Sequence, residues 1–224
     1  MNSIDFYYMP ESPPCQSVEM VADLIGVNLN KHYINLFTKD HMKEEYIRIN
    51  PQHKVPFIID GDVKLGESRA IMAYLVNKYK PSDALYPSDP AKRAAIDELL
   101  YFDATTLYPS GSKLFRPILF EGRKDLDTEA DQAYRENLKH LDEKLMERAT
   151  KFIHGDNLTI ADVALCSSLT FARCFDYDFE PHKHLHAYFN RLRESIPNYS
   201  RITDDAVLNV KDFIKSRASS GWEY

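Results

Sequence analysis

The sequence has little glycine, little cysteine and no long apolar run. Seven glycines in 224 residues exclude a collagen-like or glycine-rich low-complexity chain. No apolar stretch approaches the roughly 20 residues that a membrane-spanning helix needs, so we expect no membrane partner. The three cysteines (Cys15, Cys166 and Cys174) are odd in number and form no CxxC pair. This favours reduced thiols over a disulfide framework.

The chain also lacks an excess of positive charge. The chain has 28 Lys and Arg against 34 Asp and Glu, a formal net charge of -6, and it contains no Lys/Arg run. This balance argues against a non-specific nucleic-acid partner. The first residues, MNSIDFYYMPESPP, lack the basic start and apolar core of a secretory signal. The composition is that of a globular protein, and with the unpaired cysteines it predicts a cytoplasmic location.

The first half of the chain alternates between strand-like and helix-like patterns. Residues 4–9 are β-branched and aromatic, and the segment after them places apolar residues at helical spacing until Gly26. Further strands are expected at residues 30–37, 55–60 and 62–66, and further helices at 39–50 and 67–80. The first crossover requires a parallel pair and the Asp60-Gly61-Asp62 turn adds a hairpin. We therefore predict a mixed four-stranded sheet in the thioredoxin-like arrangement.

The second half reads as almost entirely helical. Residues 80–90 contain three prolines and no periodicity, which is typical of a linker. Amphipathic stretches follow at residues 91–107, 114–120, 129–149, 159–175, 181–195 and 207–218. The fold class is thus α/β plus all-α. We expect an N-terminal domain over residues 1–82, a linker over 83–90 and a helical bundle domain over 91–224.

LTIADVAL (residues 158–165) has the pattern of a helix start, and we expect it to be a structural feature rather than a reactive site. Thr159 is placed to cap the helix, and Asp162 is placed to reach back to the amide of the cap residue. HKHLH, by contrast, is a weak metal candidate. His182 and His186 are four residues apart, but no HExxH glutamate or nearby cysteine completes a zinc pattern, so we expect no metal.

Two candidate sites lie near the N-terminus. Ser12 precedes a helix, where it would either cap the helix or stabilise an anion such as a thiolate. Cys15 is a second possible nucleophile, although a small packed residue is the simpler interpretation. In NPQHKVP, a cis bond at Val55-Pro56 would present the Val55 backbone to a peptide ligand, and His53 would donate to a carboxylate. The alternative is a surface histidine beside a strand-start proline.

Two further candidates follow along the chain. In GESRAI, the amides of Ser68 and Arg69 open a helix and would bind a carboxylate, while Glu67 would take an ammonium group. Together they match the two charges of an α-amino acid, although an ordinary cap would look similar. The aromatic residues between Leu99 and Phe120 would either wall an apolar pocket or form helix core. They are Tyr101, Phe102, Tyr108, Phe115 and Phe120.

The segments YYMPESPPC, NPQHKVP, ESRAIMAYL and LTIADVAL together resemble the cytosolic glutathione S-transferases, in the same order and spacing. The resemblance extends over essentially the whole chain and is strongest to the delta/epsilon type of insects and other arthropods. It implies an enzyme that conjugates glutathione to apolar electrophiles, or uses it for elimination or peroxide reduction. It also implies glutathione as cosubstrate, no metal, and a homodimer.

The resemblance assigns roles to individual residues. Ser12 would hydrogen-bond the glutathione sulfur and lower the pKa of its thiol. Glutathione would otherwise be bound by His41, His53, Lys54, Val55, Pro56, Glu67, Ser68 and Arg69. The apolar second substrate would face Pro14, Leu36, Tyr108, Phe115, Arg116 and Phe120.

The chain departs from the family pattern at several positions. Glu11 stands before Ser12 where relatives often have a small residue, and it would either weaken thiolate formation or point to solvent. Trp222, in the polar tail, would either be disordered or cover the pocket. Two alternative functions therefore stay open: a non-catalytic carrier of hydrophobic ligands or structural relative, and a thiol–disulfide reductase that uses Cys15.

Overall fold

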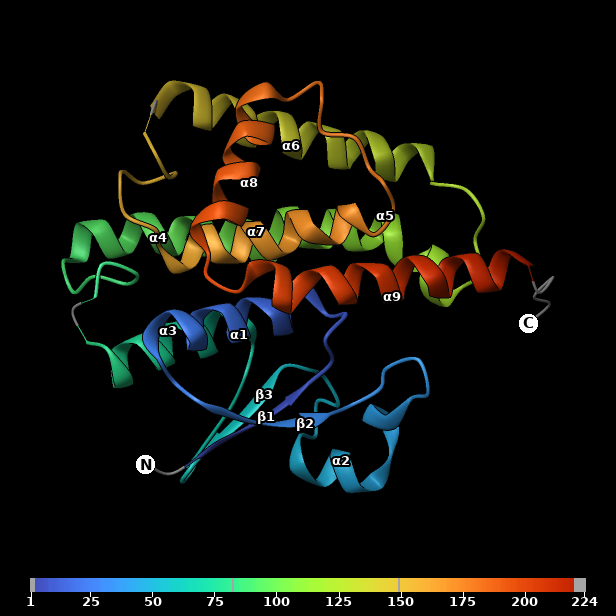
Figure 1. The fold of residues 1–224 in the computed structure, drawn as a ribbon, viewed down its shortest axis with the longest axis horizontal. Helices are drawn as coiled ribbons and strands as arrows, with labels where there is room; N and C mark the ends of the chain where they lie inside the picture. The colour runs from blue at the N-terminus through green and yellow to red at the C-terminus, as the bar shows by residue number, and fades with distance from the viewer. Residues whose placement is uncertain (1–2, 82, 149, 220–224) are drawn as a thin grey trace.

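The computed structural model describes residues 3–81, 83–148 and 150–219, and it has a sheet domain below a helical domain (Figure 1). The strands are β1 (Ile4–Tyr8), β2 (Leu29–Tyr33), β3 (Phe57–Asp60) and β4 (Val63–Gly66). Their order is β2-β1-β3-β4, with β1 parallel to β2 and antiparallel to β3, and β3 antiparallel to β4. The mixed four-stranded sheet is confirmed, although β2 ends at Tyr33 rather than at Phe37.

The helices of this domain cover both faces of the sheet. They are α1 (Pro13–Ile25), the short 3-10 turn η1 (Asp40–Met42), α2 (Glu44–Ile49) and α3 (Ser68–Tyr79). α1 and α3 lie between the sheet and the helical domain, whereas α2 lies on the opposite side (Figure 1). α1 ends at Gly26, whose left-handed φ of 72° terminates the helix with minimal steric cost.

The helical domain is built from α4 (Pro90–Phe102), α5 (Tyr108–Phe120), α6 (Thr128–Arg148), α7 (Ile160–Arg173), α8 (Lys183–Ser195) and α9 (Tyr199–Ser219). The sequence predicts separate helices over residues 91–107 and 114–120, and the break between them is wrong. A π-helical turn, η2 (Asp103–Leu107), carries the chain from α4 directly into α5. Pro109 sits in the first turn of α5, where its missing N–H is tolerated.

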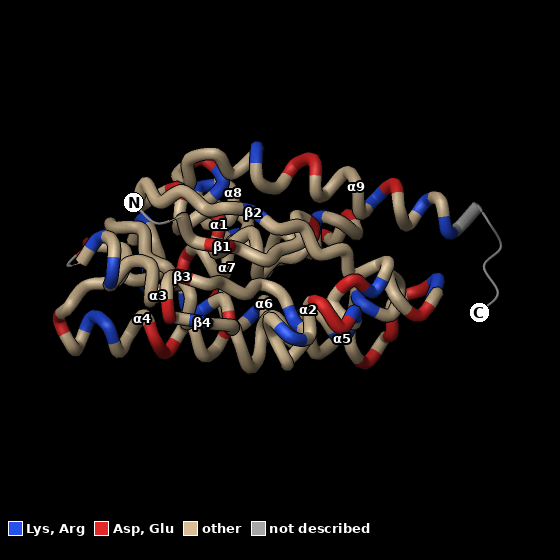
Figure 2. Tube along the Cα trace, turned by 90° about the horizontal axis from the view of Figure 1, so that it is seen from below, with Lys and Arg blue, Asp and Glu red and all other residues tan. Residues whose placement is uncertain are grey.

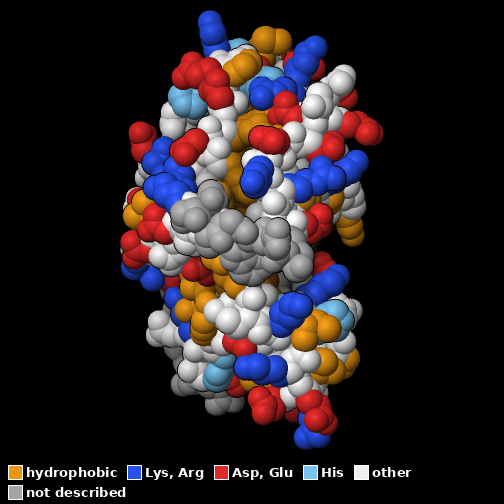
Figure 3. Space-filling model, turned by 90° about the vertical axis from the view of Figure 1, so that its right-hand side faces the viewer, with side chains coloured by type: hydrophobic (Ala, Val, Ile, Leu, Met, Phe, Trp, Pro, Cys, Tyr) orange, Lys and Arg blue, Asp and Glu red, His pale blue; other side chains and the backbone are white. Residues whose placement is uncertain are grey.

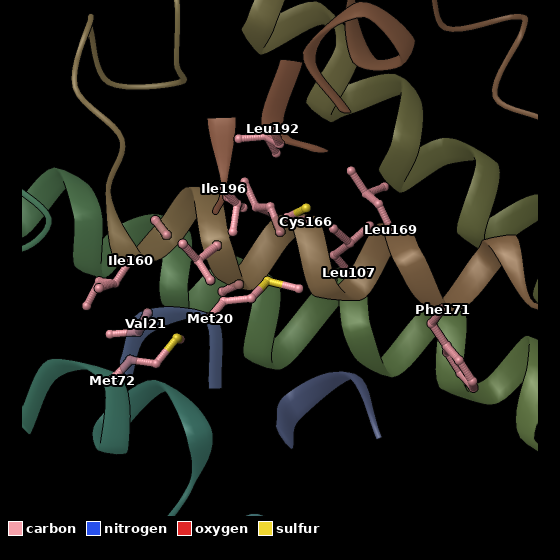
Figure 4. Close-up of a cluster of buried hydrophobic side chains, with 14 of the residues drawn as sticks. Met20, Val21, Met72, Leu107, Ile160, Cys166, Leu169, Phe171, Leu192 and Ile196 are labelled. Atoms are coloured by element: carbon pink, nitrogen blue, oxygen red, sulfur yellow. The ribbon is translucent and has the colours of Figure 1, made fainter. Parts of the chain in front are cut away.

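A continuous apolar core joins the two domains around α7. Met20 of α1, Met72 of α3 and Leu192 of α8 converge on this helix, whose own Ile160, Cys166 and Leu169 are among the side chains drawn in Figure 4. The residues named here are 0% exposed. Because the core is shared, the loops of the sheet domain are held against the helices that face them.

The start of α7 confirms the predicted capping box. Thr159 accepts a hydrogen bond from the Asp162 amide, and the Asp162 carboxylate accepts one from the Thr159 amide at 2.8 Å. Asp162 is 0% exposed, and it also accepts hydrogen bonds from Tyr188 Oη at 2.6 Å and the Ile153 amide at 3.2 Å. One carboxylate thus ties α7 to α8 and to the loop before α7.

The surface carries charges of both signs. Acidic and basic residues are interspersed along outer helices such as α9 (Figure 2), and the face in Figure 3 shows the same mixture. Within residues 3–81, 83–148 and 150–219, no helix is long and apolar enough to cross a bilayer. Over the same ranges, no group of three or more His, Cys, Asp or Glu is arranged to hold a metal ion. Trp222 lies outside the described residues.

Candidate active site

A cleft of about 620 Å³ opens where the sheet domain meets α5. It brings together four separate segments of the sheet domain: the β1–α1 loop, the segment between β2 and α2, the loop before β3, and the β4–α3 junction. All the residues to which the family resemblance assigns a role, except Phe115 and Phe120, line it. They are Ser12, Pro14, Leu36, His41, His53, Lys54, Val55, Pro56, Glu67, Ser68, Arg69, Tyr108 and Arg116.

Ser12 occupies the N-cap position of α1, but its side chain makes no capping hydrogen bond. No free backbone amide of the first helical turn stands beside it. Pro13 and Pro14 have no N–H, and the amide of Cys15 donates to the Ser12 carbonyl at 2.9 Å. Ser12 therefore lines the cleft without a capping role, and its side chain also hydrogen-bonds the Cys15 thiol. Its hydroxyl is the local donor that an anion there would meet, reinforced by the positive end of α1.

The loop before β3 presents backbone and imidazole groups. The Val55-Pro56 peptide bond is cis, as predicted. Neither the amide nor the carbonyl of Val55 is bonded to any residue that the structure describes. Asn50, which the sequence analysis missed, donates from Nδ2 to the Lys54 carbonyl at 2.9 Å and positions this loop.

His41 and His53 stand side by side, with ring centroids 6.4 Å apart. Burial, and then the nearby positive groups of His53 and Arg116, lower the pKa of His41. Its imidazole is therefore neutral at pH 7 and retains one N–H donor. The buried Nδ1 of His41 has no hydrogen-bond partner among the described residues, as expected for a group that meets a ligand.

The α3 start presents an acid beside unbonded amides. Glu67, the N-cap residue, has a left-handed φ of 62°, an uncommon backbone conformation for a residue other than glycine. The amides of Ser68 and Arg69 donate to no acceptor in the described part of the chain. This arrangement fits a carboxylate at the amides and an ammonium group at Glu67, which is what the pattern predicted.

Arg69 is held by a buried partner that the sequence analysis missed. Its Nε donates to Asp103 Oδ2 at 3.0 Å, its Nη2 bonds the same oxygen, and its Nη1 donates to Ser68 Oγ at 2.8 Å. Asp103, on η2, is 0% exposed, and it accepts a further hydrogen bond from Ser168 Oγ at 2.6 Å. The π-helical turn that carries Asp103 has no clear sequence signal, so only the packed structure identifies the pair.

If the α3 start binds glutathione, as the family resemblance implies, replacing Asp103 with asparagine should weaken that binding, because Arg69 would lose its charged partner and the α3 start its support. We expect the KM for glutathione to rise on the order of tenfold, which corresponds to the loss of one charge-assisted hydrogen bond. The exposed pair of Glu98 and Lys144 provides the control, since Glu98→Gln breaks only a surface ion pair. Equal KM values for the two variants would contradict this role of Asp103.

A narrow apolar recess of about 40 Å³ adjoins the cleft and shares Ser12, Leu36, Tyr108 and Arg116 with it. Phe120 lines this recess, and its ring stacks on Phe37 at a centroid distance of 5.5 Å. The prediction that Phe115 faces the second substrate is wrong. Phe115 is 0% exposed and stacks on Phe175 at 4.5 Å, on the side of α5 that faces the core.

Cys15 is packed in the core and 1% exposed. Burial raises the pKa of its thiol to about 12, although the neighbouring Ser12 side chain lowers it in part. Because a thiolate is the nucleophile in disulfide exchange, this environment argues against a reductase that uses Cys15. It agrees instead with the interpretation of Cys15 as a small packed residue.

The three cysteines should resist thiol reagents in the folded protein. All are buried, and burial raises the pKa of each thiol, so at about pH 8 each stays protonated and covered. A thiol titration should detect none of them rapidly in native protein and all of them after denaturation in guanidinium. Rapid labelling of Cys15 in the native state would contradict this expectation and support a thiol–disulfide reductase that uses Cys15.

Comparisons with known proteins agree with this geometry. Residues 6–83 match the family model of the glutathione S-transferase N-terminal domain, and residues 87–195 match that of the C-terminal domain. The chain belongs to the glutathione S-transferase family. Its activity is accordingly that of a glutathione transferase, and the predicted fold class, an α/β domain followed by an all-α domain, is confirmed.

Solved structures of insect glutathione transferases share this fold along their whole length. A delta-class enzyme of Nilaparvata lugens is 36% identical with a TM-score of 0.88, over 96% of this chain and 99% of that chain. An epsilon-class enzyme of the housefly Musca domestica is 31% identical with a TM-score of 0.87, over 96% and 98%. A homologue from Drosophila mojavensis, with bound glutathione, is 31% identical with a TM-score of 0.86, over 97% and 98%.

Proposed function

We propose that Ser12 activates the thiol of glutathione, and that the thiolate then attacks an apolar electrophile in the recess beside it. The observation that carries this proposal is the convergence of four separate segments of the sheet domain on one cleft, which Ser12 lines with a side chain that does not cap α1. These segments offer separate partners for the three parts of the tripeptide. Family membership alone does not assign these partners to the parts of glutathione.

Each part of glutathione would have its own site. The unbonded Val55 amide and carbonyl would pair with the backbone of the cysteinyl residue, with Pro56 and Lys54 shaping the same loop. His41 and His53 would hold the glycine carboxylate. The amides of Ser68 and Arg69 would bind the γ-glutamyl carboxylate, and Glu67 would take its ammonium group.

The chemistry would require little beyond activation and proximity. The Ser12 hydroxyl donates a hydrogen bond to the sulfur and, with the α1 dipole, favours the thiolate over the thiol. The thiol proton leaves to solvent. The sulfur electron pair then forms the new bond to carbon. In a substitution the leaving group departs with its bonding electrons, and in a conjugate addition the π electrons of the double bond shift to form an enolate that water protonates. Pro14, Leu36, Tyr108, Arg116 and Phe120 would surround the electrophile.

The test is a titration of bound glutathione by its ultraviolet thiolate absorption, combined with turnover of a chlorodinitrobenzene. We expect the pKa of the bound thiol to lie below the free value of about 8.5, with conjugation that saturates in both substrates. Tight binding of apolar ligands without turnover of any electrophile would instead establish the non-catalytic carrier.

The remaining expectations are part of the same proposal. We infer a delta/epsilon-type enzyme that acts as a homodimer in the cytoplasm, with domain limits at residues 1–82 and 91–224 and a linker at 83–90. The family resemblance supports the dimer, and the buried, unpaired cysteines support a reducing compartment. Sedimentation of the purified protein tests the dimer directly.

A further inference from the structure

Glu11 places a carboxylate at the edge of the second-substrate recess. It lies in the β1–α1 loop next to Ser12, and it lines the recess together with Arg116 and Phe120. Its Oε1 accepts a hydrogen bond from Asn209 Nδ2 of α9 at 3.0 Å. This contact joins residues 198 positions apart and fixes the carboxylate against the wall that α9 contributes.

The second oxygen of this carboxylate has no partner. Glu11 Oε2 is buried, and no group in the described part of the chain donates to it. No ion pair joins Glu11 to Arg116 over the same ranges, and the Arg116 guanidinium lies over the Phe120 ring at 4.9 Å. A buried acceptor without a donor is unfavourable, so a group that supplies a donor there is bound more tightly than one that does not.

The recess is small enough to restrict which group of a substrate can enter it. Its volume of about 40 Å³ accommodates a hydroxyl or amine group, or a single water molecule, but not an entire electrophile. The main body of the electrophile would lie in the larger cleft, because the two spaces share Ser12, Leu36, Tyr108 and Arg116. A substrate group in the recess would thus sit close to both Glu11 and the Ser12 hydroxyl.

We propose that Glu11 is a specificity-determining residue that accepts a hydrogen bond from a hydroxyl or N–H group on the electrophile. This rests on the proposed function of the cleft. An ionised carboxylate accepts but does not donate, so an electrophile with a suitably placed donor satisfies Oε2. An electrophile without one leaves the oxygen unpaired, which gives its transition state no such stabilisation.

The experiment compares two electrophiles that differ only in a donor group. A 2-alkenal and the same alkenal with a hydroxyl group beside its double bond serve as probes, and each rate is divided by the uncatalysed rate with glutathione. In the wild-type enzyme, we expect kcat/KM to favour the hydroxylated alkenal by about 10- to 100-fold, the range of a hydrogen bond to a charged group. In Glu11→Ala this preference should fall to near unity.

The other variants separate charge, position and folding. Glu11→Gln retains an acceptor oxygen and should keep part of the preference, while Asn209→Leu leaves the carboxylate unanchored and should lower it. Glu180→Gln removes an exposed acid outside the cleft and is the matched control. Thermal unfolding confirms that each variant is folded.

The outcomes distinguish this inference from the proposed function. If the wild type turns over both alkenals without preference, or if Glu11→Ala keeps the wild-type ratio, the role of Glu11 is wrong while the transferase mechanism stands. If neither alkenal nor a chlorodinitrobenzene is turned over, the proposed function itself fails. A preference that is lost in Glu11→Ala but kept in Glu180→Gln supports the assignment.

Discussion

Replacing Ser12 with alanine is expected to lower kcat/KM for glutathione conjugation by about 10²-fold. The size follows from the loss of one preorganised donor to a developing or resident anion, which typically costs 10²- to 10³-fold. The loss should be large here because Pro13 and Pro14 provide no backbone N–H that could replace the hydroxyl.

The pH dependence should show the cause of this loss. Without the hydroxyl, the pKa of the bound thiol should rise toward its free value of about 8.5, so less thiolate is present at neutral pH. The deficit should therefore be larger at about pH 6.5 than at about pH 9, when wild type and variant are compared in the same buffers.

Two controls accompany this measurement. Ser12→Thr keeps a hydroxyl and should restore part of the activity. Ser17→Ala removes a hydroxyl from the same helix, but that group donates to the Pro14 carbonyl at 2.9 Å and lies outside the cleft. If Ser12→Ala left both turnover and the thiol pKa unchanged, Ser12 would not be the activating residue.

Replacing Asp162 with alanine is expected to lower the free energy of unfolding by about 3–5 kcal/mol. The Asp162 carboxylate is 0% exposed, and it accepts hydrogen bonds from the Thr159 and Ile153 amides and from Tyr188 Oη. Its loss would leave these buried donors unpaired at the point where α7, α8 and the preceding loop meet. The same substitution also leaves a cavity in the core.

Thermal and urea unfolding measure this effect. For a chain of this size, 3–5 kcal/mol corresponds to a decrease in Tm of roughly 10 °C. Asp156→Ala is the matched control, because Asp156 lies in the same loop and is exposed. Asp162→Asn keeps the volume but not the charge, and it should lie between the two. Equal unfolding curves for Asp162→Ala and Asp156→Ala would contradict the role of this capping box.

Much of the fold and most of the cleft were predictable because their signals are local. Pro10, Pro13 and Gly26 mark element ends, and Asp60-Gly61-Asp62 marks the hairpin. Such residues restrict the backbone wherever they stand. The binding segments lie at the ends of strands and helices, where unpaired backbone groups occur. The sheet order places these ends on one side of the domain, so the structure unites segments that the sequence indicated separately.

The predictions that were wrong concern which face of a helix meets the core and where one helix gives way to the next. Periodicity shows that one face of α5 is apolar, but it does not distinguish a face against the core from a face against a ligand. Phe115 and Phe120 illustrate the difference: one packs on Phe175, and the other lines the recess. Similarly, the turn at η2 depends on how α4 and α5 pack on their neighbours, and short-range pattern does not encode that packing.

The amino-acid sequence by itself therefore determined the fold class, the family and the loops that form the cleft. Only the tertiary structure decided which side chains meet across it. Arg69 and Asp103 are 34 residues apart, and Glu11 and Asn209 are 198 apart. Such pairs form because the shared core around α7 brings η2, α9 and the sheet domain into contact. Since that contact results from the packing of many side chains together, no local segment of sequence specifies it.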